Sequence, residues 1–221
     1  MEKDSGGISP LAAILVFAAT FVLALILLGM VYDLFGYYIT LLVQEPLLVV
    51  LPLGYMLYKR VDIRNYIGFE VKLKTILLGI SLGALVFLFD MFIFNVLTSV
   101  FGVSETVEEV NTLYANMSSS PQGLLTLIVA FSLAGVCEEF TFRGFLQTAF
   151  NRKYSFGPAL LVSSLAFSLI HFDPQLIYTL SAFLIGLLLG YIYHHWHSYA
   201  ASAIAHATVN LIALALMLLT R

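Results

Sequence analysis

The stretch LIVAFSLAGVCEEFTFRGFLQTAF, residues 127–150, is an apolar helical segment that carries two adjacent acids in its middle. Glu138 and Glu139 lie side by side, and Arg143 follows one helical turn later. An ionisable group at the depth of a bilayer costs at least about 2–3 kcal/mol, so a pair of acids there marks a functional site by default. The rest of the chain can be interpreted by asking which residues face this pair.

Composition places most of the chain in or near a membrane. Of the 221 residues, 61% are apolar and only 10% are charged, and several apolar runs reach the roughly 18 residues that a membrane-spanning helix needs. We predict an all-α polytopic transmembrane bundle of about seven spans, six to eight, that forms a single domain over 1–221. Any chemistry must then be done by the bundle itself. The net charge of −3 and the lack of a basic patch argue against nucleic acid as a partner.

The distribution of charge predicts how the bundle is oriented. Basic residues gather in the connections 59–74 and 150–157, whereas the 102–122 loop carries three glutamates and no base. Cytoplasmic loops are enriched in Lys and Arg, so the two basic connections are expected in the cytoplasm. The expected spans are 11–32, 37–58, 75–101, 123–149, 158–172, 175–197 and 199–219.

Helix geometry predicts that polar residues from three spans meet at one depth. Counted from the basic turn between their two spans, Glu139 lies roughly 18 Å and His171 roughly 20 Å into the membrane. Counted from the turn before the last span, His206 lies roughly 12 Å and Asn210 roughly 18 Å deep. These two turns share one side of the membrane by parity. We therefore expect the four side chains to converge in one layer.

The acid pair is expected to divide into a structural and a reactive member. Arg143 stays protonated and can neutralise Glu139, its i,i+4 neighbour. Glu138 is then left buried beside a second carboxylate without a partner on its own helix, and both conditions favour its protonated form. A carboxyl group of this kind, with His171 at the same depth, can take a proton from water.

His206 and Asn210 are also i,i+4 neighbours and share a helix face. Their N–H groups could stabilise the oxyanion that forms when water attacks a carbonyl group. Together with a group that activates water, this pattern indicates amide hydrolysis.

Three motifs in sequence order resemble a known family. They are CEEFTFRG at 137–144, which contains E-E-x-x-x-R, FSLIH at 167–171, which gives F-x-x-x-H, and HATVN at 206–210, which gives H-x-x-x-N. The chain resembles the CAAX protease and bacteriocin-processing (CPBP or Abi) family of intramembrane endopeptidases, related to type II CAAX prenyl endopeptidase. The resemblance implies a catalytic helical core at 123–219, preceded by N-terminal helices, 1–122, that carry no signature.

The resemblance also implies roles for the residues that match the motifs. Glu138 and His171 would activate water, and His206 and Asn210 would form the oxyanion hole. Zinc could in principle be held by Glu138, His171 and His206. We expect no cofactor, because no H-E-x-x-H motif is present and no carboxylate is evident to orient either histidine. The expected substrate is a peptide or protein segment near the membrane, and the expected setting is a prokaryotic cell membrane with the site facing the cytoplasm.

Two other functions are compatible with the sequence. A proton-coupled carrier would depend on the membrane acids Asp90 or Glu45 and would cleave no peptide. An immunity or scaffold protein on the same fold would keep the expected ion pair of the acid cluster but would tolerate replacement of Glu138 or His171. The sequence leaves the oligomeric state undetermined.

Overall fold

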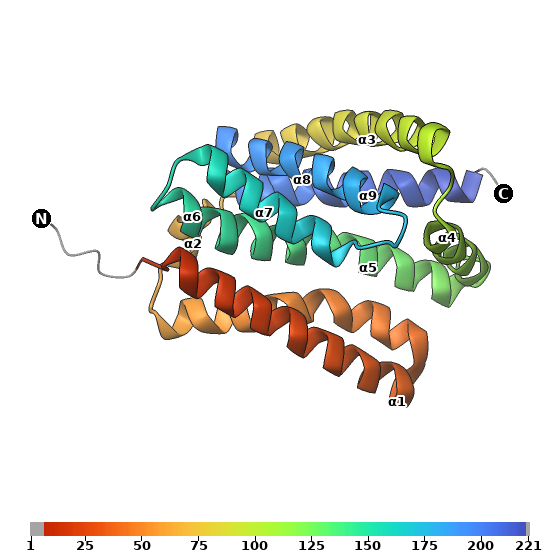
Figure 1. Ribbon diagram of the computed structural model, residues 1–221, viewed down its shortest axis with the longest axis horizontal. Helices are drawn as coiled ribbons and strands as arrows, with labels where there is room; N and C mark the ends of the chain where they lie inside the picture. Colours follow the sequence, from red (N-terminus) through yellow and green to blue (C-terminus); the bar gives the residue numbers. More distant parts are fainter. Residues whose placement is uncertain (1–6, 220–221) are drawn as a thin grey trace, which may run out of the picture.

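The computed structural model describes residues 7–219, which fold into an elongated bundle of helices without a strand among them (Figure 1). Within this range, five helices are long and apolar enough to cross a membrane, and α7 is a shorter apolar helix. The prediction of an all-α polytopic bundle is confirmed. The elements are α1 (Pro10–Tyr58), α2 (Ile63–Tyr66), α3 (Leu73–Phe101), α4 (Glu105–Met117), α5 (Pro121–Glu139), η1 (Phe140–Gln147), α6 (Thr148–Asn151), α7 (Phe156–Ile170), α8 (Ile177–Trp196) and α9 (Tyr199–Leu219).

The helix α1 consists of two antiparallel limbs that correspond to the predicted spans 11–32 and 37–58. The chain reverses at Gly36, whose backbone has φ 74° and ψ −177°. Glycine adopts such a conformation without a steric penalty, because it has no Cβ atom. Figure 1 shows the first limb running away from the N-terminal end and the second limb returning beside it. With α7 counted, the bundle therefore has the seven apolar segments that the sequence predicted.

The two ends of the bundle differ in charge. One end, here called the basic end, holds α2, α6 and the connections 59–74 and 150–157, where Lys and Arg gather. The other end, here called the acidic end, holds the reversal of α1, the helix α4 with its three glutamates, and the loop 171–176 (Figure 1). The two ends therefore correspond to the two faces of the membrane.

Close contacts of α9 with its neighbours bring the polar residues of α5 and α9 together. A Cβ atom at Gly135 of α5 would lie 2.5 Å from the backbone nitrogen of Ala207. A Cβ atom at Gly83 of α3 would lie 2.5 Å from the carbonyl oxygen of Ala205. Small residues allow membrane helices to approach closely, and here they bring Glu138 and His206 to the same depth.

The helix η1 continues α5 as a π-helix and forms a buried plug toward the basic end. All eight of its residues are buried. Thr141 Oγ1 donates to the Leu48 carbonyl oxygen at 2.9 Å, which is free to accept because Pro52, four residues later, has no N–H. Gln147 Nε2 donates to the Gly190 carbonyl oxygen at 2.9 Å. Single π-helical turns often lie at functional sites.

Candidate active site

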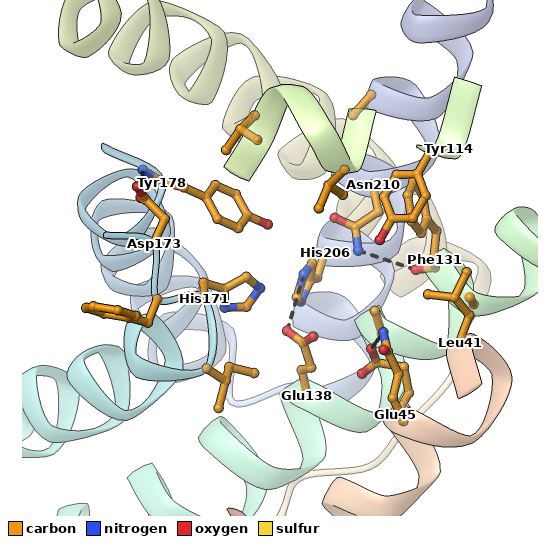
Figure 2. A pocket seen from close by; sticks show the side chains of 18 of the residues that line it. Leu41, Glu45, Tyr114, Phe131, Glu138, His171, Asp173, Tyr178, His206 and Asn210 are labelled. Atoms are coloured by element: carbon orange, nitrogen blue, oxygen red, sulfur yellow. Dashed lines mark hydrogen bonds and ion pairs between the residues drawn. The ribbon is translucent and has the colours of Figure 1, made fainter. Parts of the chain in front are cut away.

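A cavity of about 570 Å³ lies between α1, α4, α5 and α9 and the loop after α7. Four of the six predicted site residues line it, namely Glu138, His171, His206 and Asn210. Figure 2 shows Glu138 and His206 on one side of this space and His171 across from them. The predicted convergence of three spans is therefore present in the structure. The other two predicted residues, Glu139 and Arg143, lie behind the cavity wall.

Glu139 and Arg143 form a fully buried ion pair. Arg143 Nη1 lies 2.8 Å from Glu139 Oε1, and both side chains are inaccessible to solvent. Arg143 Nη2 also donates to the Gly186 carbonyl oxygen at 3.0 Å. The other Glu139 oxygen accepts a hydrogen bond from Ser202 Oγ. A buried carboxylate with this many donors remains charged, as the sequence led us to expect for Glu139.

The ion pair fixes the orientation of His206. His206 Nδ1 lies 3.1 Å from Glu139 Oε1, and a carboxylate can only accept, so Nδ1 carries a hydrogen. The opposite nitrogen, Nε2, is thereby directed at Glu138 and lies 3.8 Å from its Oε2 (Figure 2). Sequence reasoning paired His206 with Asn210 and did not predict that Glu139 orients it. The carboxylate sought to orient this histidine is thus present, on α5.

His171, like His206, uses its Nδ1 for a contact outside the cavity. Its Nδ1 lies 2.9 Å from the carbonyl oxygen of Phe167, which can only accept, so Nδ1 carries the hydrogen of the neutral ring. The lone pair of Nε2 is then available to accept a hydrogen bond. The ring lies 5.4 Å from that of Tyr178, centroid to centroid. His171 is therefore arranged as an acceptor at the cavity wall.

Phe167, the first residue of the F-x-x-x-H motif, separates three functional side chains. Its ring centroid lies 4.6 Å from that of His171, 5.6 Å from that of His206 and 4.6 Å from the Arg143 guanidinium carbon. A guanidinium group is attracted to an aromatic face at this distance. The apolar ring thus holds the two histidines apart and covers the buried ion pair.

Asn210 lies one turn beyond His206 on α9, as predicted. Its Nδ2 donates to the carbonyl oxygen of Phe131 at a long 3.4 Å, and Figure 2 shows the amide at the cavity wall near Tyr114. An amide group has two N–H donors, so this contact occupies one of them. The second donor remains for a group in the cavity.

Glu45, which the sequence suggested only for the carrier alternative, lines the same cavity as the predicted site residues. It is buried on α1. Figure 2 shows its carboxyl group on the same side of the cavity as Glu138, and neither Glu45 Oε2 nor Glu138 Oε2 receives a hydrogen bond from the described residues. Two carboxylates that face one buried cavity repel each other when both are charged. No local pattern reveals this arrangement, because it joins residues 93 positions apart.

Asp90, the other acid flagged in the sequence, has a local partner. Ser181 Oγ donates to Asp90 Oδ1 at 2.6 Å, which links α3 to α8. Asp90 also lines the cavity, on the wall formed by α3.

The candidate zinc ligands Glu138, His171 and His206 do not form a metal-binding group. Among residues 7–219, no three His, Cys, Asp or Glu side chains converge closely enough to hold an ion. His206 already uses Nδ1 for Glu139, and His171 lies across the cavity (Figure 2). We therefore derive no step through a metal, and the expectation of a cofactor-free site stays a prediction.

Long apolar helices around a buried Glu/His/Asn site define an integral membrane protein with an intramembrane site. Residues 120–212 match the family model described as Rce1-like, type II CAAX prenyl endopeptidase Rce1-like. This match confirms the resemblance predicted from the three motifs, and the matched segment contains all six predicted site residues. No curated protein and no solved structure was found to match the chain. At the level of the family, the match supports an intramembrane protease.

Proposed function

We propose that this chain is an intramembrane endopeptidase that hydrolyses a peptide bond with water activated by Glu138 and His171. The observation that carries the proposal is that Glu138, His171 and His206, each from a separate helix and each within the segment matched by the protease family, face one cavity. Acids and imidazoles inside a bilayer cost free energy. A cavity lined by them is therefore a functional-site candidate by default.

Water activation follows from the hydrogen-bonding roles of the two residues. A water molecule between them donates one hydrogen bond to His171 Nε2, whose lone pair faces the cavity. Its other proton moves to the Glu138 carboxylate while its oxygen attacks the peptide carbonyl carbon. The C–N bond then breaks, and Glu138 returns the proton to the leaving nitrogen. The net reaction consumes one water and one peptide bond and yields a carboxyl group and an amine.

His206 is proposed as the main donor to the oxyanion. Because Nδ1–H is directed at Glu139, a hydrogen bond from Nε2 to the oxyanion requires that His206 carry both protons. Glu139 accepts from His206 Nδ1, and Arg143 in turn holds Glu139 in place. Glu139 and Arg143 are therefore positioning residues. The free N–H of Asn210, one turn away, is the second donor.

The proposed substrate is a peptide or protein segment at the membrane, and the proposed location is a prokaryotic cell membrane. A prenylated C-terminus is one substrate of this kind, but a family resemblance does not transfer substrate class.

The function can be tested by mass spectrometry of membrane peptides from cells that produce either the wild-type chain or Glu138→Gln. The wild-type cells are expected to contain a cleavage product that the variant cells lack, which would also identify the substrate. Identical peptide sets from equally abundant proteins would contradict proteolysis and favour an immunity or scaffold role.

A further inference from the structure

The cavity is sealed toward the basic end of the bundle. No described residue of α2, η1 or α6 lines it, and every residue of η1 is buried. The plug is hydrogen-bonded to three other helices. Thr141 donates to α1, and Arg143 and Gln147 both donate to α8. Ser163 of α7 donates to Gln147 Oε1 at 3.0 Å. Neither water nor a peptide can reach Glu138 from that end without breaking the plug.

The cavity is open toward the acidic end. Its rim there includes Phe172, whose side chain is 62% exposed. Polar rim residues of α4, Thr106 and Asn111, are exposed as well. The cavity therefore extends from the acid pair to the acidic end, along the limbs of α1 and the last turns of α9.

The amphipathic helix α4 covers this opening. Val107, Val110 and Tyr114 line the cavity from one side of the helix, while its glutamates are exposed. The start of α4 is attached to the loop beside His171, where Ser104 Oγ donates to Asp173 Oδ1 at 3.2 Å. A short helix held by a few contacts is the kind of element that opens at low cost.

The charges at the two ends identify the membrane face concerned. The basic end is cytoplasmic by the positive-inside rule, and the acidic end lies on the other face. The sequence suggested a site that opens toward the cytoplasm. The burial pattern favours the opposite face, since Glu139 lies roughly 18 Å from the basic turn, beyond the middle of a hydrocarbon core about 30 Å thick.

We propose that the substrate reaches the site from the non-cytoplasmic face, past α4, and is a peptide segment exposed on that face. This inference rests on the proposed function for the nature of the substrate, but the access route can be tested without any cleavage assay. It predicts that segments exposed only in the cytoplasm are not substrates.

Cysteine labelling in cells tests the route. The chain has one cysteine, the buried Cys137, so Cys137→Ala provides a background without thiols. Into it we would place Asn111→Cys on α4, Gln44→Cys on the cavity wall and, as the matched control, Ser155→Cys in the exposed basic turn. Each variant is treated with a charged, membrane-impermeant maleimide in intact cells and again after permeabilisation.

The proposal expects Asn111→Cys and Gln44→Cys to be labelled in intact cells and Ser155→Cys only after permeabilisation. Labelling of Ser155→Cys alone in intact cells would overturn the assigned faces. Failure of Gln44→Cys to react from outside, with Asn111→Cys reactive, would overturn the route past α4. If Asn111→Cys is poorly produced, Thr106→Cys on the same rim replaces it.

Discussion

The plug formed by η1 toward the basic end and the opening covered by α4 toward the acidic end, here called the mouth, are built differently. In the plug, Phe142, Arg143 and Phe145 are completely buried, and polar side chains are bonded to neighbouring helices. In the mouth, Phe172 is mostly exposed, and α4 is held by the Ser104 to Asp173 hydrogen bond and packing on α5. On the proposed function, the plug would fix the reactive geometry and the mouth would admit the substrate. Changes in the plug should therefore unfold the protein, and changes in the mouth should alter substrate handling.

The largest effect is expected for Arg143→Met in the plug. Loss of the guanidinium group leaves Glu139 charged and unpaired in the interior, which costs about 3–5 kcal/mol. Thermal unfolding in detergent should show a much lower midpoint. Lys74→Met removes an exposed charge and is expected to stay within about 0.5 kcal/mol of the wild type. Equal midpoints for both variants would contradict a structural role for the ion pair.

A smaller loss of stability is expected for Gly135→Ala, which lies on α5 between the plug and the mouth. The added Cβ would lie 2.5 Å from the backbone of Ala207, and overpacking of this kind costs about 1–3 kcal/mol. Because α9 must shift, His206 moves relative to Glu138 and turnover should fall. Gly29→Ala, where a Cβ meets nothing within 4 Å, should be neutral or stabilising by up to about 1 kcal/mol. A stable, fully active Gly135→Ala protein would show that the contact is not needed.

Glu45→Gln should affect activity more than folding. The substitution preserves shape but removes a carboxyl group that lines the same cavity as Glu138, and we expect turnover to fall about tenfold, or about 1.4 kcal/mol in the barrier. Asp90→Asn is the matched control. Asp90 is hydrogen-bonded to Ser181, so this variant should lose less activity than Glu45→Gln. The measurement is the rate of peptide cleavage by purified proteins. A larger loss of cleavage rate for Asp90→Asn than for Glu45→Gln would contradict the role given to Glu45 and favour a carrier-like proton path.

The smallest effect on stability is expected for Val110→Ala in the mouth. The side chain is only half-buried, so the cost should be about 0.5–1 kcal/mol. Since Val110 lines the cavity, the KM for a peptide should rise about threefold with little change in kcat, the signature of lost uniform binding. A changed kcat with a constant KM would place Val110 in the chemistry rather than in substrate binding.

The sequence predicted the bundle and the meeting of the four residues because both depend on local regularities. Hydrophobic run length determines the spans, and helical rise determines the depth of Glu139, His171, His206 and Asn210. The structure places Glu138 in the cavity and Glu139 behind its wall. The remaining features depend on packing between distant helices. Glu45 and Glu138 line one cavity, but no sequence pattern relates their two helices. The hydrogen bond between Glu139 and His206 depends on how α9 is rotated against α5.

Two further features had weak signals in the sequence. The plug arises where α5 widens into a π-helix, and only Gly144 within CEEFTFRG hinted at irregular backbone there. The helix α4 was included in a loop because its apolar stripe, Val107, Val110 and Tyr114, is too short for a span. Its amphipathic spacing could have identified it as a helix that covers an apolar opening.

Turnover by purified Glu138→Gln is the most direct test of whether the acid at the base of the cavity activates water. Glutamine has nearly the same shape but cannot take a proton from water, so peptide cleavage should fall at least about 100-fold while the unfolding midpoint stays at or above that of the wild type. Cleavage within about twofold of the wild-type rate would contradict general-base catalysis by Glu138.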